Sequence, residues 1–263
     1  MRSEWALFWA EFAGTALLVA AGVSLVILDF GSGSPVAAAI PSEAARRALT
    51  GFGFGCVGAL IAISPLGKAS GAHINPVVTL AFWLNGTMRG RYAVGYVAAQ
   101  LAGAVAGALP LLAWGPIGAS VAYGATVPGA GVGAWTALAG ETATTAALVV
   151  GVFVFVGHAR LRRFTPLLFP ALYALMVWAE APISGTSTNP ARTLGPAVVS
   201  GVWRAFWVYL AGPVAGTLLA FSSHRLTWLR KFEVEVSKLY HFTHDPHGVL
   251  CRDRRRAPGS GGG

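Results

Sequence analysis

The sequence predicts an all-α membrane protein in which six transmembrane helices and two shorter half-helices form an inverted repeat. Three observations support this fold class. The chain of 263 residues is 55% hydrophobic and only 11% charged, whereas charged residues make up about a quarter of an average soluble domain. Six apolar runs are long enough, at about 20 residues, to cross the hydrocarbon core of a bilayer. Two sequence motifs also occur twice, once in each half of the chain.

The six apolar runs define the predicted spans. Their approximate ranges are 5–28, 48–66, 92–114, 135–157, 164–182 and 203–221. The first run is longer than the apolar core of a signal peptide, and no small-residue cleavage site follows a basic start, so we expect it to be retained as a span. The chain is therefore predicted to cross the bilayer several times.

Two pairs of matching motifs divide the chain into repeats. The segment EFAGTALLV from Glu11 returns as ETATTAALV from Glu141, and SGAHINPVVTL from Ser70 returns as SGTSTNPARTL from Ser184. Each repeat holds three spans, and because three is odd, the two repeats must have opposite orientations in the membrane. We therefore expect one domain in 1–224, made of repeat one (1–114), a Gly- and Pro-rich loop (115–134) and repeat two (135–224).

Each SG motif leads into a short apolar run that begins with Asn-Pro. These runs, 76–84 and 190–199, are too short to span a bilayer. Asparagine is a favourable N-cap and proline suits the first helical turn, so Asn75 and Asn189, each followed by proline, predict helix starts. One such dipeptide indicates only a helix start. Two in matching positions of an apolar chain predict a pair of half-helices.

Two carboxylates, Glu11 and Glu141, lie inside predicted spans. A carboxylate at that depth costs about 2.5–3.5 kcal/mol on insertion scales, so it needs hydrogen-bond donors. The irregular loops before the half-helices offer backbone N–H groups that need partners at membrane depth. We expect the two carboxylates to support these loops. The alternative, a proton relay, would need further ionisable groups in series along the spans, and the sequence shows none.

The paired Asn-Pro motifs, the SGAH before the first and Arg192 after the second resemble the aquaporin, or major intrinsic protein, family. The resemblance covers about residues 5–224. It implies that the half-helices meet near the midplane and that the protein is a homotetramer with a pore through each subunit. The central motifs are Asn75, Pro76, Val77, Asn189, Pro190 and Ala191. Val77 departs from the usual alanine, and Lys68 replaces a customary histidine before SGAH.

Half-helices of this kind would shape conduction through their ends. The positive N-terminal ends of both half-helices would point at the centre of the pore and repel cations. If the side-chain carbonyls of Asn75 and Asn189 cap their own helices, the NH₂ groups remain as donors toward the lumen. A passing water must then offer its oxygen to both, which interrupts a proton wire. We expect passive conduction that excludes ions.

The resemblance also implies a selectivity filter of four residues. An ungapped alignment from the asparagines gives Gly55, Val177, Thr186 and Arg192. Water-selective members typically place a large aromatic residue and a histidine at the first two positions, so the filter here is expected to be wide. Gly55 could instead be a helix-packing glycine, since Gly51 lies four residues before it. The alignment at Gly55 is also sensitive to a shift of one residue, because the neighbours Phe54 and Cys56 differ greatly in size, so a shift would change the predicted width of the filter.

Arg192 and its neighbours bear on the solute. Arg192 is expected to face the pore and supply fixed donors; the alternative is a snorkelling arginine or one paired with Glu180. Glycerol-conducting members usually carry aspartate where Thr193 stands, whereas Leu210 resembles the glycerol type and Tyr209 the water type. We expect glycerol-like solutes and neutral metalloid hydroxides (arsenite, antimonite, boric acid) to pass as well as water.

Other functions fit the sequence less well. An orthodox water-selective channel stays open as an alternative, as does an ion-coupled secondary transporter, for which Glu11 and Glu141 are the only candidate coupling sites. A closed, adhesive relative of the channels is a further alternative. An intramembrane enzyme would need a Ser/His pair or two carboxylates near the midplane. The sequence predicts no catalytic residue, no cofactor, no metal site and no nucleic-acid partner.

Charge sets the predicted topology. The net charge is +9, and its positive residues are sorted by loop, as in membrane proteins. With the amino terminus inside, both termini are cytoplasmic, and we expect a plasma or inner membrane. The cytoplasmic side then carries Arg2, Lys68, Arg89, Arg91, Arg160, Arg162, Arg163 and the tail from Arg225, leaving Arg46, Arg47 and Arg204 outside.

The tail, 225–263, is polar and basic, and we expect it to be disordered on the cytoplasmic side, close to anionic lipid. Its three histidines and Cys251 lack the paired spacing of a structural zinc site. The other cysteine, Cys56, lies in the second span, so a disulfide between the two is not expected.

Overall fold

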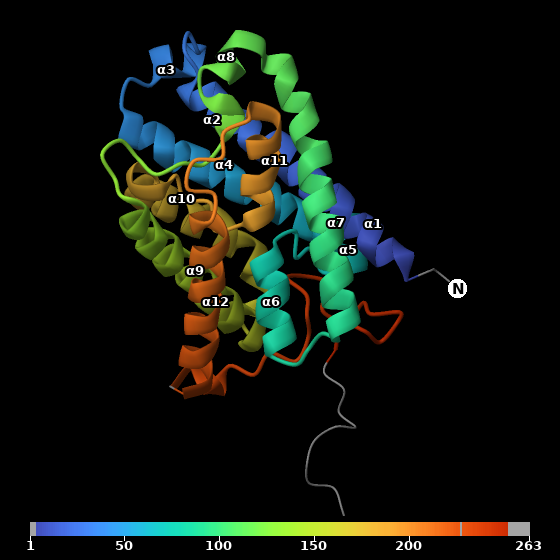
Figure 1. The fold of residues 1–263 in the computed structure, drawn as a ribbon. Helices are drawn as coiled ribbons and strands as arrows, with labels where there is room; N and C mark the ends of the chain where they lie inside the picture. The colour runs from blue at the N-terminus through green and yellow to red at the C-terminus, as the bar shows by residue number, and fades with distance from the viewer. Residues whose placement is uncertain (1–3, 227, 252–263) are drawn as a thin grey trace, which may run out of the picture.

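The two half-helices lie at the centre of a bundle of long helices (Figure 1). The computed structural model describes residues 4–226 and 228–251, and the regular structure of this part is helical. In Figure 1, α11 (Pro190–Ser200) lies above α6 (Pro76–Leu84), and the connecting loops meet between them. We call the side on which α6 ends the α6 end of the bundle, and the opposite side, on which α11 ends, the α11 end.

Repeat one begins with a span, Trp5–Phe30, that is not uniform. It consists of α1 (Trp5–Leu17), a π-helical stretch (Leu18–Gly22) and α2 (Val23–Phe30). A short helix, α3 (Pro35–Ala39), precedes the second span. The remaining elements are α4 (Glu43–Ile63), α5 (Pro65–Ser70), α6 (Pro76–Leu84), α7 (Gly90–Ala108) with a 3₁₀ turn (Leu109–Trp114), α8 (Gly115–Ala119) and a second 3₁₀ turn (Ala122–Gly124).

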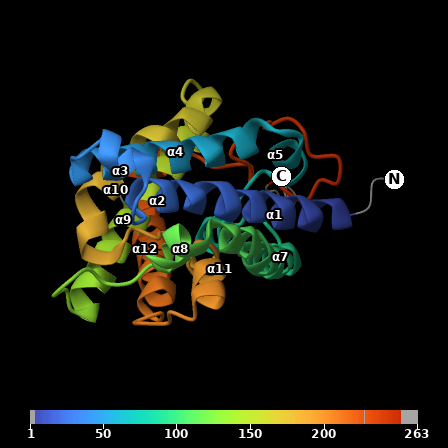
Figure 2. The same cartoon turned by 90° about the horizontal axis from the view of Figure 1, so that it is seen from above.

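Repeat two follows the same plan. Its elements are α9 (Ala134–Gly157), a 3₁₀ turn (Arg162–Phe164), α10 (Thr165–Ser184), α11 (Pro190–Ser200) and α12 (Val208–Leu226), after which a last 3₁₀ turn (Trp228–Lys231) begins the tail. Seen from above, α1 crosses the molecule between α4 and α7 (Figure 2). Long helices from both repeats thus surround the central loops.

The helix boundaries follow local capping chemistry. The half-helices start at Pro76 and Pro190, as the Asn-Pro motifs predict, because Asn75 and Asn189 accept hydrogen bonds from the first helical N–H groups. The second span begins five residues earlier than predicted, since the Ser42 hydroxyl caps α4. It also ends earlier, because Ser64 starts a separate helix there.

Apolar surface identifies the crossing helices. In the described residues, five helical segments are long and apolar enough to span a membrane, and they match the first five predicted spans. The sixth, α12, has 19 residues, and its last turns carry Ser222, Ser223, His224 and Arg225, which lower its apolar average. Large side chains such as Trp135 (76% exposed) and Leu167 (65%) point outward. Such residues suit a lipid environment.

Glycines set the closest helix contacts, and they do so in both repeats. A Cβ on Gly103 of α7 would lie 2.3 Å from the Phe12 carbonyl oxygen, and one on Gly216 of α12 would lie 2.4 Å from that of Thr142. Both positions therefore require glycine so that backbones can touch. The third span of each repeat thus packs on its first in the same way.

The tail differs from the sequence-based expectation. Residues 232–251 are not a free extension; they fold across the α6 end of the bundle (Figure 1). Four apolar side chains in this segment are at most 5% exposed: Val234, Leu239, Val249 and Leu250. The prediction of disorder was wrong for these residues. It rested on the polar composition of the whole tail, which does not show that a few leucines and valines can be buried against the helices. Cys56 and Cys251 are both free. Arg2 and residues 252–263 lie outside the described part of the chain.

Candidate functional site

Asn75 and Asn189 join the two half-helices at the centre of the molecule. The Asn75 Oδ1 atom accepts from Val77 N (3.0 Å), and Asn189 Oδ1 accepts from Ala191 N (3.0 Å). Each amide Nδ2 donates across to the other repeat: Asn75 to the Thr188 carbonyl (2.9 Å) and Asn189 to the Ile74 carbonyl (3.0 Å). One hydrogen of each NH₂ group is thereby used. The second hydrogen is available on a side chain that lines a cavity, described below.

Glu11 supports the loop before α6. It is fully buried and receives four hydrogen bonds. The donors are Ser70 Oγ (2.6 Å), His73 N (3.0 Å), Ile74 N (2.7 Å) and Gln100 Nε2 (2.7 Å). Two of the four are backbone N–H groups of the irregular loop. The carboxylate therefore satisfies the loop at a depth where water cannot.

Glu141 does the same for the loop before α11. It is also fully buried, and its oxygens accept from Ser184 Oγ (2.7 Å), Ser187 N (2.7 Å) and Thr188 N (2.8 Å). Ser184 and Ser70 occupy matching places in the repeated motif. A carboxylate whose oxygens accept hydrogen bonds from one loop is held in place by that loop. This arrangement favours a role in supporting the loop over a role in proton transfer.

Both loops contain strained backbone in matching positions. Ala72 and Ile74 have φ of 55° and 43°, and their counterparts Thr186 and Thr188 both have φ of 50°. Three of these four residues are β-branched, for which a positive φ is a genuine outlier. Such strain persists only where surrounding contacts over-determine the backbone, and it gathers at functional sites. The two loops are therefore held, by their carboxylates among other groups, in a conformation that the chain alone would not choose.

One tyrosine completes the support of each loop, a role that the sequence analysis did not predict. Tyr96 donates its hydroxyl to the Ser70 carbonyl (2.8 Å), and Tyr209 donates to the Ser184 carbonyl (2.6 Å). A signal for them existed, because each tyrosine precedes by seven residues one of the packing glycines, Gly103 and Gly216. The third span of each repeat thus carries a tyrosine and a packing glycine at the same spacing.

The cavity toward the α11 end has a volume of about 270 Å³ and reaches Arg192. Arg192 is 5% exposed and donates from Nη1 to the Gly124 carbonyl (2.8 Å). Glu180, the acid considered as its partner, instead accepts from Thr186 Oγ1 (2.5 Å). A cation with a fixed, planar set of donors therefore borders this cavity.

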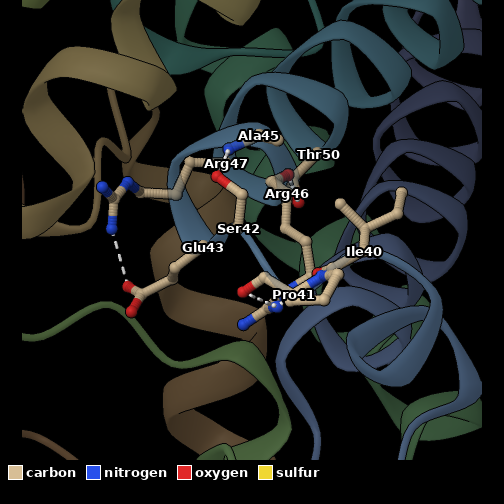
Figure 3. Close-up of polar contacts among 8 residues, drawn as sticks. All are labelled: Ile40, Pro41, Ser42, Glu43, Ala45, Arg46, Arg47 and Thr50. Atoms are coloured by element: carbon tan, nitrogen blue, oxygen red, sulfur yellow. Dashed lines mark hydrogen bonds and ion pairs between the residues drawn. The ribbon is translucent and has the colours of Figure 1, made fainter.

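A second arginine, Arg47, lines this α11-side cavity, and Figure 3 shows its ion pair with Glu43. Arg47 pairs with Glu43 (2.6 Å), and both residues line the cavity together with Thr50. The adjacent Arg46 turns away and donates to the carbonyls of Ile40 (2.6 Å) and Pro41 (3.1 Å). Glu43 is 63% exposed, and an ion pair that is open to solvent contributes little to stability. Because the two charges cancel, the pair adds no net charge to this cavity.

The cavity toward the α6 end is smaller, at about 40 Å³. Its polar lining is Asn75, Asn189 and His73, and its apolar lining includes Phe54 and Leu239. The volume exceeds the roughly 10–15 Å³ that one water needs. This α6-side cavity is therefore large enough for water beside the two central asparagines.

The expected filter residues do not all meet. Val177 and Arg192 line the α11-side cavity, and Thr186 directly follows Gly185, which also lines it. Gly55 lines the α6-side cavity instead, and a Cβ there would lie 2.4 Å from the Phe169 carbonyl oxygen.

Helix geometry explains the position of Gly55. Phe169 is eight residues from Val177, which is about 12 Å along α10 at 1.5 Å per residue. Because α4 and α10 run in opposite directions, the α4 residues that line the α11-side cavity with Val177 come from the start of α4: Glu43, Arg47 and Thr50. Gly55 thus serves helix contact, the alternative that its spacing from Gly51 allowed.

The Asn-Pro motifs otherwise lie where the pattern places them. Pro76 and Pro190 occupy the first helical turn, and Val77 and Ala191 are 1% and 0% exposed. Val78, not Val77, lines the α6-side cavity. The unusual Val77 therefore acts through packing around the half-helix.

Comparison with known proteins gives one consistent result. Residues 2–224 match the family model described as "Major intrinsic protein". Aquaporin AqpM of Methanothermobacter marburgensis is 34% identical over 228 residues, which cover 80% of this chain and 92% of the relative. Aquaporin A of Dictyostelium discoideum is 34% identical over 232 residues, which cover 86% of this chain and 80% of the relative.

A solved structure agrees with this at the level of the fold. The aquaglyceroporin from Plasmodium falciparum superposes with a TM-score of 0.69 at 20% identity, covering 86% of this chain and 97% of that one. At this identity the likeness concerns the path of the backbone and not the solute.

Proposed function

The chain belongs to the major intrinsic protein family of membrane channels, and on this premise we propose that its pore passes small uncharged solutes as well as water. The favoured solutes are glycerol-like polyols and the neutral hydroxides of arsenic, antimony and boron. Members of this family are channels and not enzymes. The observation that carries the proposal is the α11-side cavity of about 270 Å³ that reaches Arg192 and Val177.

The chemistry of this cavity suits a polyol. Arg192 presents N–H donors in a fixed plane, which can bind hydroxyl oxygens. Val177 offers an apolar surface for carbon-bound hydrogens where water-selective relatives typically carry histidine. A small uncharged solute can therefore satisfy both surfaces at once.

Cations are repelled at the centre of the pore. The N-terminal ends of α6 and α11 meet there, and each carries the positive end of a helix dipole. Arg192 adds a full positive charge on the α11 side. Cations therefore meet three unfavourable fields, and Asn75 and Asn189 offer donors that a passing water must accept from.

A water-selective channel is the second candidate, and one observation favours it. The α6-side cavity is only about 40 Å³ and is bordered by Phe54 and Tyr173, whose ring centroids are 5.7 Å apart. Such a passage suits water more readily than glycerol.

Stopped-flow light scattering on proteoliposomes separates the two candidates. Water, glycerol and boric acid fluxes are compared for the wild type, Val177→Phe and the control Val214→Phe, whose valine is 39% exposed on the bundle surface. We expect glycerol flux above that of empty liposomes in the wild type and control, and a loss of about tenfold or more in Val177→Phe, as for steric selection by one side chain.

Two results would contradict the proposal. Wild-type liposomes that pass water but neither glycerol nor boric acid would identify a water-selective channel. Flux that requires a sodium or proton gradient would identify an ion-coupled transporter.

We also propose that the α6 end faces the cytoplasm of a plasma or inner membrane. Its loops and tail carry most of the basic side chains, among them Lys68, Arg91 and Arg160, whereas Arg46, Arg47 and Arg204 lie toward the α11 end. Cytoplasmic loops carry an excess of Lys and Arg. Both termini then lie in the cytoplasm. The family likeness further supports a homotetramer with one pore in each subunit.

A further inference from the structure

We propose that residues 232–251 are an autoinhibitory plug that closes the channel at the α6 end, and that the pore conducts when this segment leaves. The inference rests on the channel function but not on which solute passes. It concerns the part of the chain beyond the residues that match the family model, which end at 224.

The plug binds the re-entrant loop itself. Leu239 N donates to the Gly71 carbonyl (3.0 Å), and His73 Nε2 donates to the Ser237 carbonyl (3.0 Å). Gly71 and His73 belong to the SGAH motif that precedes the central Asn75. Polar groups next to the pore that would otherwise bind water are therefore occupied by the tail.

Leu239 forms part of the wall of the pore cavity. Its side chain is 3% exposed and lines the α6-side cavity that Asn75 and Asn189 also line. A solute that leaves the two asparagines toward the α6 end meets this isobutyl group. An apolar side chain offers no hydrogen bond to replace those lost by a water or polyol, so Leu239 both blocks and dewets the exit.

Three further contacts fasten the plug around the exit. Asn85, at the end of α6, donates to the Val234 carbonyl (2.9 Å). Lys238 Nζ donates to the Lys68 carbonyl in α5 (2.8 Å). His241 Nε2 donates to the carbonyl of Ile63, the last residue of α4 (2.9 Å). The segment is thus attached to three different helices.

The distal half of the segment holds Leu239 in place. Ser237 N donates to the Leu250 carbonyl (2.7 Å), and the Asp245 carboxylate accepts from the N–H groups of Val249 and Leu250. Leu250 and Val249 pack with Leu7, Met88, Tyr92 and Tyr96. The plug is therefore a folded-back loop with its own small apolar base.

The composition of the interface favours release. Lys238 is fully buried, and the bonds from its Nζ go to two carbonyl oxygens, those of Lys68 and His244. Ser237 Oγ is buried without a hydrogen-bond partner. Burial of a charge and of an unsatisfied hydroxyl both weaken docking. The contacts are sufficient to close the pore while leaving a modest barrier to opening.

The test compares water permeability per channel in proteoliposomes. The variants are a chain truncated after Lys231, the point variant Leu239→Ala and the control Glu233→Ala, whose side chain lies in the same segment and is exposed. We expect the first two to raise water permeability about tenfold, which corresponds to a docked state favoured by about 1.4 kcal/mol. The control should match the wild type.

Folding is checked by the oligomer peak in size-exclusion chromatography. If the truncated chain fails to fold, Leu239→Ala decides, because it removes only the side chain at the exit. Folded Leu239→Ala with wild-type or lower water permeability would overturn the plug. The solute proposal fails separately, through the ratio of glycerol to water flux, which the plug should leave unchanged.

Discussion

Glu11 and Glu141 show how single residues maintain an irregular backbone inside a membrane. Each accepts from a serine hydroxyl and from two consecutive loop N–H groups. Neither loop could form these bonds with water at that depth. The carboxylates thereby stabilise the strained conformations of Ile74 and Thr188, which position the central asparagines.

Removal of one carboxylate should therefore destabilise the protein strongly. Glu141→Ala leaves the N–H groups of Ser187 and Thr188 without their acceptor, at about 1–3 kcal/mol for each buried orphan. We expect a marked fall in the midpoint of thermal unfolding in detergent.

The control is Glu43→Ala, which removes a carboxylate that is 63% exposed and pairs with Arg47. Surface pairs contribute roughly 0–1 kcal/mol, so the midpoint should hardly move. Equal midpoints for the two variants would contradict the supporting role of Glu141.

At the scale of elements, helix packing decides the role of Gly55. A Cβ at this position would lie 2.4 Å from the Phe169 carbonyl oxygen, whereas a Cβ on Gly58 of the same helix has open space around it. The two glycines are three residues apart on α4 and both line the α6-side cavity, but only Gly55 also touches the backbone of α10. They form a matched pair for testing the register of α4 against α10.

We expect Gly55→Ala to destabilise the fold by about 1–3 kcal/mol, because overpacking forces the helices apart. Gly58→Ala should be neutral or stabilise by up to about 1 kcal/mol, since alanine is the better helix former. Thermal unfolding in detergent measures both. If Gly55→Ala is as stable as Gly58→Ala, α4 has a different register from the one described.

The docked tail should respond to pH through Lys238. Burial lowers the pKa of Lys238 from 10.5 to about 8, with Lys68 acting in the same direction and Asp245 and Cys251 opposing. Between these two values the released segment holds a proton that the docked segment has lost. Docking therefore strengthens as pH rises through this range and weakens as pH falls through 8.

Water permeability of the full chain should accordingly fall between pH 7 and pH 10, measured by stopped flow. Lys238→Met removes the titrating group and should flatten this profile. A full-length profile that rises with pH, or one that persists in Lys238→Met, would show that another group controls docking.

At the scale of the whole molecule, apolar side chains cover the outside of the bundle. Trp135, Leu167 and Val94 are 65–76% exposed. Lipid can cover these residues, and so can neighbouring subunits. The family likeness favours four subunits, each with its own pore between α6 and α11.

Native mass spectrometry in detergent should therefore give a complex of four chains of 27.2 kDa each. A tetramer buries part of the apolar surface in subunit contacts, which resist detergent better than single helices do. A monomer as the only species, under conditions in which water flux survives reconstitution, would contradict this assembly.

Much of this molecule could be predicted from the sequence. Hydrophobic runs and paired Asn-Pro motifs predicted the fold class and both half-helices, because span length and capping are local properties. The repeat likewise suggested matching roles for Glu11 and Glu141. Boundaries were less well predicted where a serine cap, such as Ser42 or Ser64, moved a helix start.

Other features were decided only by tertiary structure. Gly55 faces α10 instead of the α11-side cavity. An ungapped alignment counted back from Asn75 could not reveal this position, because the separate helix α5 lies between the two residues. The tail closes over the exit because Leu239 and Leu250 are buried against side chains that come together only after the helices pack. The sequence thus determined the helices and their central motifs, which depend on neighbours along the chain. Packing determined the cavity walls, because their residues meet only in the folded molecule.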